Sequence, residues 1–96
     1  KREYYDSGLK VPVMVHFPGQ TRPVYVDDLI SFVDLAPTML SLAGIKIPDY
    51  LEGQAFLGPQ KAKTPRKYVF GSADRFDGYA DRIRVVRDKR YLYVRN

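Results

Sequence analysis

The 96-residue sequence predicts an α/β chain: one strand of a parallel sheet, then one helix, then a small antiparallel sheet. Three observations lead to this fold class. Residues 11–17 are an apolar, β-branched run, residues 35–43 repeat apolar side chains at helical spacing, and residues 83–95 contain two strand-like stretches separated by a short polar gap. We expect two parts, an α/β part at residues 1–60 and part of an antiparallel subdomain at residues 61–96.

The run at residues 11–17 reads VPVMVHF and is followed by Pro18 and Gly19. A near-continuous apolar strand is typical of a parallel sheet, in which both faces of the strand are buried. A parallel strand requires neighbours supplied by crossover connections, and the rest of this sequence offers none. The strand is therefore orphaned, and we expect its neighbours to lie before residue 1 in a longer polypeptide.

The clearest helix is predicted at residues 35–43. Asp34 is a suitable N-cap, Pro37 falls in the first turn, and Gly44 follows the last helical residue. One face of this helix is apolar, and we expect it to pack in a core. Its members are Leu35, Met39, Leu42 and Ala43.

Glycine and proline punctuate residues 44–67, which predicts an irregular connection, and the basic stretch 61–67 is expected to be exposed and mobile. Strands are then expected at residues 68–70, 83–87 and 91–95. The three-residue gap between the last two favours an antiparallel hairpin, although no Asn-Gly or Asp-Gly pair defines the turn type.

Composition and charge narrow the functional classes. The sequence has no cysteine, which excludes a disulfide scaffold and a thiol nucleophile within these residues, and no apolar run reaches the roughly 18 residues of a membrane span. Residues 1–60 carry five Lys/Arg and seven Asp/Glu, whereas residues 61–96 carry eleven and four. The basic end indicates either an anionic partner or a solvated sheet face. No RNA-binding signature accompanies its tyrosines, so we expect no nucleic-acid partner.

Few side chains suggest chemistry on their own. His16 is the single histidine and lacks the further ligands that a metal site needs. The adjacent Asp27 and Asp28 could bind a hard cation, but turn or cap roles are commoner. A polar stretch could present its charges to a sugar or an anion, or pair them with one another at the surface. Its charged members are Asp74, Arg75, Asp77, Asp81 and Arg82.

Four segments in register resemble one family. Residues 1–12 match Lys-x-x-x-(aromatic)-(acid)-(small)-Gly-(apolar)-(Lys/Arg)-Val-Pro, and residues 31–44 match a Val-Asp-(apolar)-x-Pro-Thr helix that ends in Gly. Residues 47–54 resemble a Pro-x-x-x-x-Gly turn, and residues 84–96 resemble a closing hairpin, with Leu92 in place of a lysine. Together they are similar to the C-terminal region of sulfatases of the alkaline phosphatase superfamily, especially bacterial sulfatases and the heparan N-sulfatase group.

The resemblance implies the end of a calcium-dependent sulfuric ester hydrolase that acts on a sulfated carbohydrate or an aryl sulfate. In that family a formylglycine, made from Cys or Ser in a Cys/Ser-x-Pro-x-Arg motif, attacks sulfur while calcium holds the sulfate. Lys1 falls on the family's sulfate-contacting lysine, whose ammonium suits a tetrahedral anion. Arg75 and Asp77 lie where the N-sulfatase group places substrate-recognising residues. His16, Asp27 and Asp28 match no functional position.

The nucleophile motif is absent, since no serine is followed by Pro at +2 and Arg at +4. The family's calcium ligands are absent too, so we expect no metal site in this chain. We therefore expect a fragment, inactive alone, whose calcium ligands, formylglycine and principal partner lie in the upstream part of its own polypeptide. Two alternatives stay open: a phosphodiester or phosphonate hydrolase of the same superfamily, or a small basic module that binds polyanions. Relatives are commonly exported, but this sequence leaves the compartment open.

Overall fold

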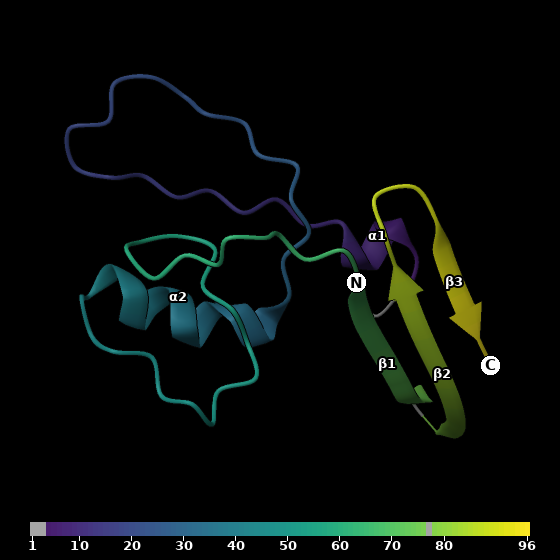
Figure 1. Cartoon of the computed structure of the whole chain (residues 1–96). Helices are drawn as coiled ribbons and strands as arrows, with labels where there is room; N and C mark the ends of the chain where they lie inside the picture. The colour runs from purple at the N-terminus through teal and green to yellow at the C-terminus, as the bar shows by residue number, and fades with distance from the viewer. Residues whose placement is uncertain (1–3, 77) are drawn as a thin grey trace.

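The main regular element is a three-stranded antiparallel sheet, seen in a computed structural model that describes residues 4–76 and 78–96 (Figure 1). Strands β1 (Val69–Phe76), β2 (Tyr79–Arg87) and β3 (Leu92–Arg95) lie in the order β1-β2-β3. Val86 of β2 pairs with Phe70 on one side and with Tyr93 on the other. The antiparallel part of the predicted fold class is therefore confirmed.

The hairpin formed by β2 and β3 is confirmed, and its turn depends on Asp88. The Asp88 carboxylate accepts the backbone N–H of Arg90 at 2.7 Å and that of Tyr91, while the Asp88 N–H donates to the Tyr91 carbonyl at 3.0 Å. This local side-chain turn takes the place that Asn-Gly has in other hairpins. Strand β1 extends beyond the predicted residues 68–70 because residues up to Phe76 also pair with β2, across an irregularity between Ala73 and Arg75.

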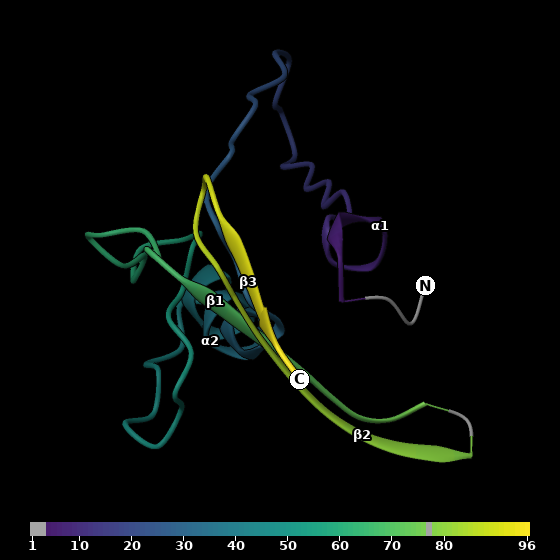
Figure 2. The same ribbon diagram turned by 90° about the vertical axis from the view of Figure 1, so that its right-hand side faces the viewer.

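The side chains of the short helix α1 (Asp6–Leu9) contact one face of the sheet, where Asp6 forms an ion pair with Arg87 of β2. Ile83 and Val85 point to this face and are buried, at 5% and 4% exposure. Leu9 of α1 lies against this face, since a Cβ built on Gly71 would be in ordinary contact with Cδ2 of Leu9, at 3.9 Å. Figure 2 shows α1 on one side of the strands and the connection that precedes β1 toward the other, where Phe70 and Tyr93 are nonetheless 73% and 63% exposed. The sheet therefore has one closed face and one open face.

The predicted helix is confirmed as α2 (Leu35–Leu42), preceded by the 3-10 turn η1 (Phe32–Asp34). Its expected packing is wrong. The buried residues are Pro37, Thr38 and Ser41, whereas the predicted core face of Leu35, Met39, Leu42 and Ala43 is exposed. The polar face is buried because the connection after the helix bonds to it through backbone N–H groups.

The predicted strand at residues 11–17 is not formed. The segment has no ladder partner among the described residues and runs through a wide loop to residue 30 (Figure 1). Its apolar side chains are open to solvent, and Met14 is 93% exposed. A parallel strand exists only with neighbours, so the apolar sequence alone cannot form one.

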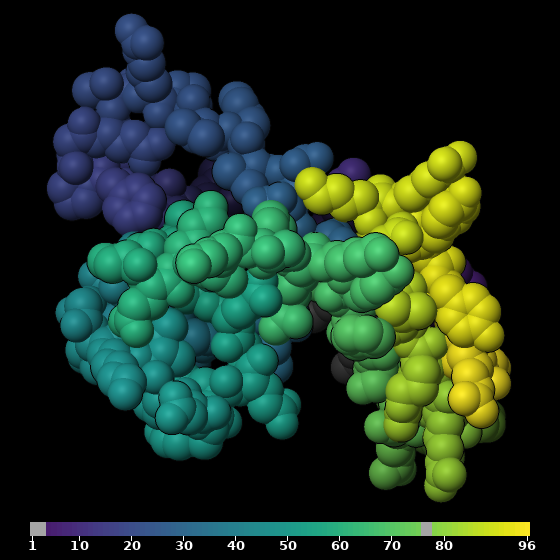
Figure 3. Space-filling view, in the orientation of Figure 1, coloured from purple at the N-terminus to yellow at the C-terminus, as the bar shows by residue number. Residues whose placement is uncertain are grey.

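The molecule is open for its mass. Its accessible surface is 8404 Å², whereas a folded protein of 11.1 kDa has about 5,700 Å². Its radius of gyration is 15.6 Å, against about 12.5 Å for a globular chain of this length. Figure 3 shows an open gap between the helical part and the tip of the β1–β2 hairpin. In the described part of the chain, no helix is long and apolar enough to cross a bilayer.

The predicted division of the chain into residues 1–60 and residues 61–96 stays a prediction, and contacts join the two parts. The described contacts include an isolated bridge between Leu29 and Arg66.

Candidate functional site

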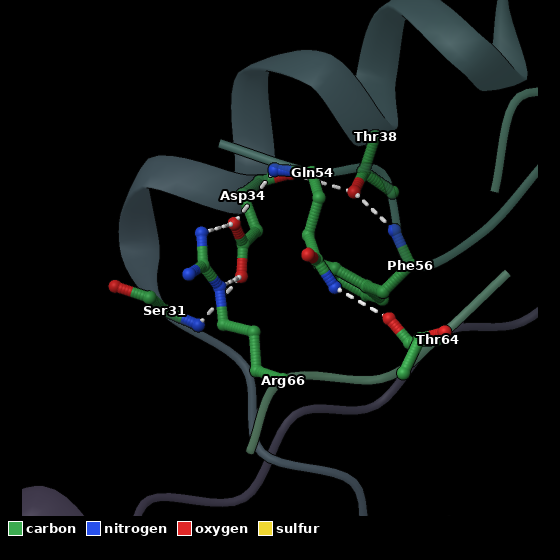
Figure 4. Close-up of polar contacts among 7 residues, drawn as sticks. All are labelled: Ser31, Asp34, Thr38, Gln54, Phe56, Thr64 and Arg66. Atoms are coloured by element: carbon green, nitrogen blue, oxygen red, sulfur yellow. Dashed lines mark hydrogen bonds and ion pairs between the residues drawn. The ribbon is translucent and has the colours of Figure 1, made fainter. Parts of the chain in front are cut away.

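A network of hydrogen bonds surrounds Asp34 at the start of α2. We call it the Asp34 cluster, and it comprises Ser31, Asp34, Thr38, Gln54 and Arg66 (Figure 4). Arg66 donates from Nε to Oδ2 and from Nη2 to Oδ1 of Asp34, both at 2.6 Å. The backbone N–H groups of Gln54 and Ser31 donate to Oδ1 and Oδ2 at 2.9 and 3.0 Å. Each carboxylate oxygen therefore accepts two hydrogen bonds.

The electrostatics of the cluster favour the ionised pair. Burial alone would raise the pKa of Asp34, whose side chain is 1% exposed. The hydrogen bond from Arg66, with those from the Gln54 and Ser31 backbone, outweighs burial and lowers the pKa below its usual value. The same hydrogen bond raises the pKa of Arg66. Asp34 occupies the predicted N-cap position of α2, but its carboxylate accepts the Ser31 backbone N–H and makes no cap hydrogen bond to the helix itself.

Two hydroxyls extend this polar contact along α2. The Thr38 hydroxyl donates to the Asp34 carbonyl at 2.6 Å and accepts the Phe56 N–H at 3.1 Å. The Ser41 hydroxyl accepts the Gln60 N–H at 2.9 Å. The approach is close enough to require glycine at position 53, where a Cβ would lie 1.9 Å from the Val33 carbonyl oxygen. Segments 31–44 and 47–54, two of the sequence motifs, are thus locked together.

The Asp34 cluster is a structural device and not a reaction centre. Its carboxylate oxygens are fully engaged, and no buried side-chain nitrogen or oxygen in residues 4–76 and 78–96 lacks a partner. A catalytic acid, base or ligand would need an open position for a substrate. The arrangement can instead fix the irregular connection against α2.

The sequence-predicted site residues lie elsewhere. Lys1 and Asp77 fall outside the described residues. Arg75 lies near the end of β1, opposite Ala80, beside the turn into β2. Its neighbour Asp74 forms an ion pair with Arg84. The register therefore places Arg75 near the end of the β1–β2 hairpin. Figure 1 shows that this end of the sheet lies opposite the β2–β3 turn.

Asp27 and Asp28 are used in ion pairs. Nζ of Lys89 lies 3.1 Å from Oδ1 of Asp27 and 3.4 Å from Oδ1 of Asp28. The hydrogen bond from Lys89 lowers the pKa of Asp27, and the pKa of Lys89 is raised in return. His16 is exposed within the unpaired segment 11–17. Among the described residues, no three His, Cys, Asp or Glu side chains gather as a metal site would require.

Sequence reasoning missed the Asp34 cluster. The prediction that residues 61–67 are exposed and mobile is wrong for Arg66, whose side chain is 21% exposed and bonded to Asp34. The two residues are 32 positions apart, and no periodicity links them. A buried acid in the first turn of a helix needs a cation, so the basic stretch was the available signal.

Comparison with known proteins identifies related chains. The family described as N-sulphoglucosamine sulphohydrolase, C-terminal, matches residues 1–95. An ulvan-active sulfatase of Formosa agariphila is 53% identical over 97 residues, covering all of this chain and 16% of the relative. A second ulvan-active sulfatase of the same organism is 35% identical over 95% of this chain and 20% of its own length.

Human arylsulfatase K is 37% identical over 64 residues, which cover 67% of this chain and 12% of the relative. The chain therefore spans a fifth or less of the length of these three relatives. No solved structure matches.

Proposed function

Because the chain belongs to the N-sulphoglucosamine sulphohydrolase C-terminal family, we propose that it is the C-terminal part of a longer sulfatase that hydrolyses sulfate from carbohydrates. We call that longer polypeptide the parent protein. The observation that carries the proposal is the 53% identity to an ulvan-active sulfatase over the whole chain. The sulfatase names of the relatives favour sulfuryl transfer over the alternative of phosphodiester or phosphonate hydrolysis.

The open surface supports a large upstream part in the parent protein. The chain exposes roughly 2,700 Å² more than a folded protein of its mass, an area typical of obligate interfaces. Three apolar surfaces are exposed: segment 11–17, segment 24–26 and the outer face of α2. In this proposal the upstream part covers them, and segment 11–17 becomes a strand once it has neighbours.

The chemistry is proposed to come from the upstream part as well. Among residues 4–76 and 78–96 no three His, Cys, Asp or Glu side chains gather, and the sequence has neither cysteine nor a Ser-x-Pro-x-Arg motif for formylglycine. In sulfatases a formylglycine supplies the oxygen nucleophile for sulfur and calcium binds the sulfate. The contribution proposed for this chain is the positive charge of Lys1 at the sulfate, with Arg75 and Asp77 contacting the substrate. The chain alone is then inactive.

The substrate proposed is a sulfated polysaccharide of the ulvan class, as in the names of the two bacterial relatives. The basic C-terminal third, with eleven Lys/Arg against four Asp/Glu, suits such a polyanion.

The test is hydrolysis by the parent protein and by the isolated chain. The parent protein is expected to hydrolyse 4-nitrocatechol sulfate and to release sulfate from ulvan, whereas the isolated chain does neither. In the parent, Lys1→Ala is expected to lower kcat/KM by at least about a hundredfold, because the variant has no charge to meet the transferring group.

Lys10→Ala is the matched control, since Lys10 is an exposed lysine nearby with no proposed role. A parent protein that hydrolyses a phosphodiester but no sulfate ester would overturn the proposal. Equal kinetics of the Lys1 and Lys10 variants would remove Lys1 from the site while leaving the reaction class intact.

A further inference from the structure

The open face of the three-stranded sheet carries aromatic and basic side chains in cross-strand rows. Alternation places Ile83 and Val85 on the face covered by α1, so their neighbours point the other way. One row contains Phe70, Val86 and Tyr93, and the next contains Ser72, Arg84 and Arg95. Arg82 precedes Arg84 on β2, beside the irregularity in the β1–β2 pairing, and is exposed as well. We call this surface the open sheet face, and it is turned toward the viewer in Figures 1 and 3.

Exposure on this face is high for such side chains. Phe70 is 73% exposed and Tyr93 is 63% exposed, and the three arginines of the face are also exposed. Large aromatic side chains are usually buried when a core is available, so two in one exposed row call for an occupant. The closed face already supplies the sheet's core through Ile83 and Val85.

The charge of the face selects the chemistry of that occupant. In the ion pairs of residues 4–76 and 78–96, Asp74 pairs with Arg84, and no acid is paired with Arg82 or Arg95. Side chains two residues apart on a strand stand about 6.7 Å apart, and directly opposite residues have Cβ atoms about 5 Å apart. The arginines therefore form a compact cationic group beside the exposed aromatic row. Such a surface complements a chain of repeated anionic groups joined by less polar rings.

We propose that the open sheet face binds the polymer of a sulfated polysaccharide at sugar units away from the one being desulfated. The proposal rests on the proposed function, because it names how the same enzyme holds the rest of its substrate. Arginine guanidinium groups pair with sulfate oxygens through bidentate hydrogen bonds, and the rings of Phe70 and Tyr93 pack against sugar rings. The occupant is a sulfated glycan and not an upstream protein segment. An apolar segment packed on this face would bury three arginines without countercharges, whereas the sulfate groups of a glycan supply them.

The experiment compares two triple variants of the parent protein that remove the same number of positive charges. Arg82→Gln/Arg84→Gln/Arg95→Gln neutralises the open sheet face. Lys46→Gln/Lys61→Gln/Lys63→Gln removes three charges from the helical part and serves as the control. Binding to dextran sulfate is measured across a series of salt concentrations, with uncharged dextran as the blank. Circular dichroism verifies that both variants are folded.

The arginine variant is expected to bind dextran sulfate at least about tenfold more weakly at 50 mM salt. Its slope of log affinity against log salt should fall by about one for each arginine–sulfate pair that the substitutions remove, as counterion release requires. The lysine variant should keep the unmodified affinity within about twofold. Phe70→Ser/Tyr93→Ser is expected to weaken the binding that persists at high salt, where the ionic contribution is screened.

Equal weakening in the two triple variants would overturn the proposal, because binding would then follow net charge alone. Full affinity in both would overturn it as well, and would show that the parent covers this face. Both outcomes are separate from the proposed function, which depends on whether the unmodified parent hydrolyses a sulfate ester, either 4-nitrocatechol sulfate or ulvan.

Discussion

The helical region, residues 31–66, and the sheet region, residues 69–95, are stabilised in opposite ways. In the helical region the buried side chains are mainly polar, with Asp34, Thr38 and Ser41 inside and the apolar face of α2 outside. In the sheet region the buried side chains are Ile83 and Val85, and the charges lie outside. The first region is therefore inverted relative to the second.

This inversion indicates which surface of each region is available for binding: the apolar face of α2 in the helical region and the open sheet face in the sheet region. A buried polar network needs every partner in place, and the Asp34 cluster supplies them within residues 31–66. This leaves the apolar face of α2 free to pack against the parent protein. The sheet closes its apolar face with α1 and leaves a basic aromatic face for a ligand. In the helical region, polar contacts therefore form the interior, and the apolar face of α2 stays available for packing against the rest of the parent protein.

The largest effect is expected from Asp34→Asn. The substitution leaves the Arg66 guanidinium in its half-buried position without a countercharge, and removal of one partner of a buried pair costs about 3 kcal/mol. Backbone amides of residues 54–60 in the parent protein should then exchange hydrogen roughly a hundredfold faster. Hydrogen exchange of peptides that cover these residues measures the change.

Asp74→Asn is the matched control in the sheet region. It removes an acid from an ion pair with Arg84 in which both side chains are more than half exposed, so about 0–1 kcal/mol is expected. Comparable destabilisation in the two variants would mean that the Asp34 cluster is no more important than a surface pair.

The next largest effect is expected from acid, which should destabilise the helical region more than the sheet region. The pKa of Asp34 lies below its usual value in the folded chain, and an unfolded aspartate titrates near about 3.9. The ionised Asp34 carboxylate therefore contributes fully to the stability of the folded chain above about pH 4. This stabilisation is lost as the pH falls through the lower pKa of the folded state. Exchange of residues 54–60, corrected for the intrinsic rate, should stay flat from about pH 7 to 5 and rise below about pH 4.

The Asp34→Asn variant should lack this acid dependence in the helical region. Asp88 also has a lowered pKa, through backbone hydrogen bonds from Tyr91 and Arg90, so the exposed β2–β3 turn shares the acid window with a smaller amplitude. Loosening of residues 54–60 that begins near about pH 6 would point to a different titrating group.

Sequence reasoning predicted the elements that local patterns determine. Asp88 sits in a short polar gap between two β-branched stretches, so the hairpin was visible without its register. Pro37 and Gly44 framed α2 correctly to within one residue. The four motifs in register gave the sulfatase family, which the match over residues 1–95 confirms.

Long-range packing was beyond those patterns. The periodicity of Leu35, Met39 and Leu42 gave an apolar face, but periodicity does not say what covers it. The pairing of Asp34 with Arg66 depends on how an irregular connection folds back over the helix, and no local rule encodes that. The roles of Lys1, Arg75 and Asp77 remain predictions.

The smallest effect is expected from Lys89→Gln, which breaks the link between the sheet region and the wide loop. Lys89 contacts Asp27 at 3.1 Å and Asp28 at 3.4 Å, and its side chain is half exposed. Water and salt screen such a pair, so only a slight change in stability is expected, and a smaller one at high salt. Hydrogen exchange of residues 22–28 in the parent protein should be nearly unchanged, because the upstream part then holds the apolar side chains of residues 24–26.

Lys63→Gln is the control for the change in net charge. A large, salt-dependent rise in exchange confined to the Lys89 variant would instead mean that the ion pairs position this loop, and that the two regions are joined by charge.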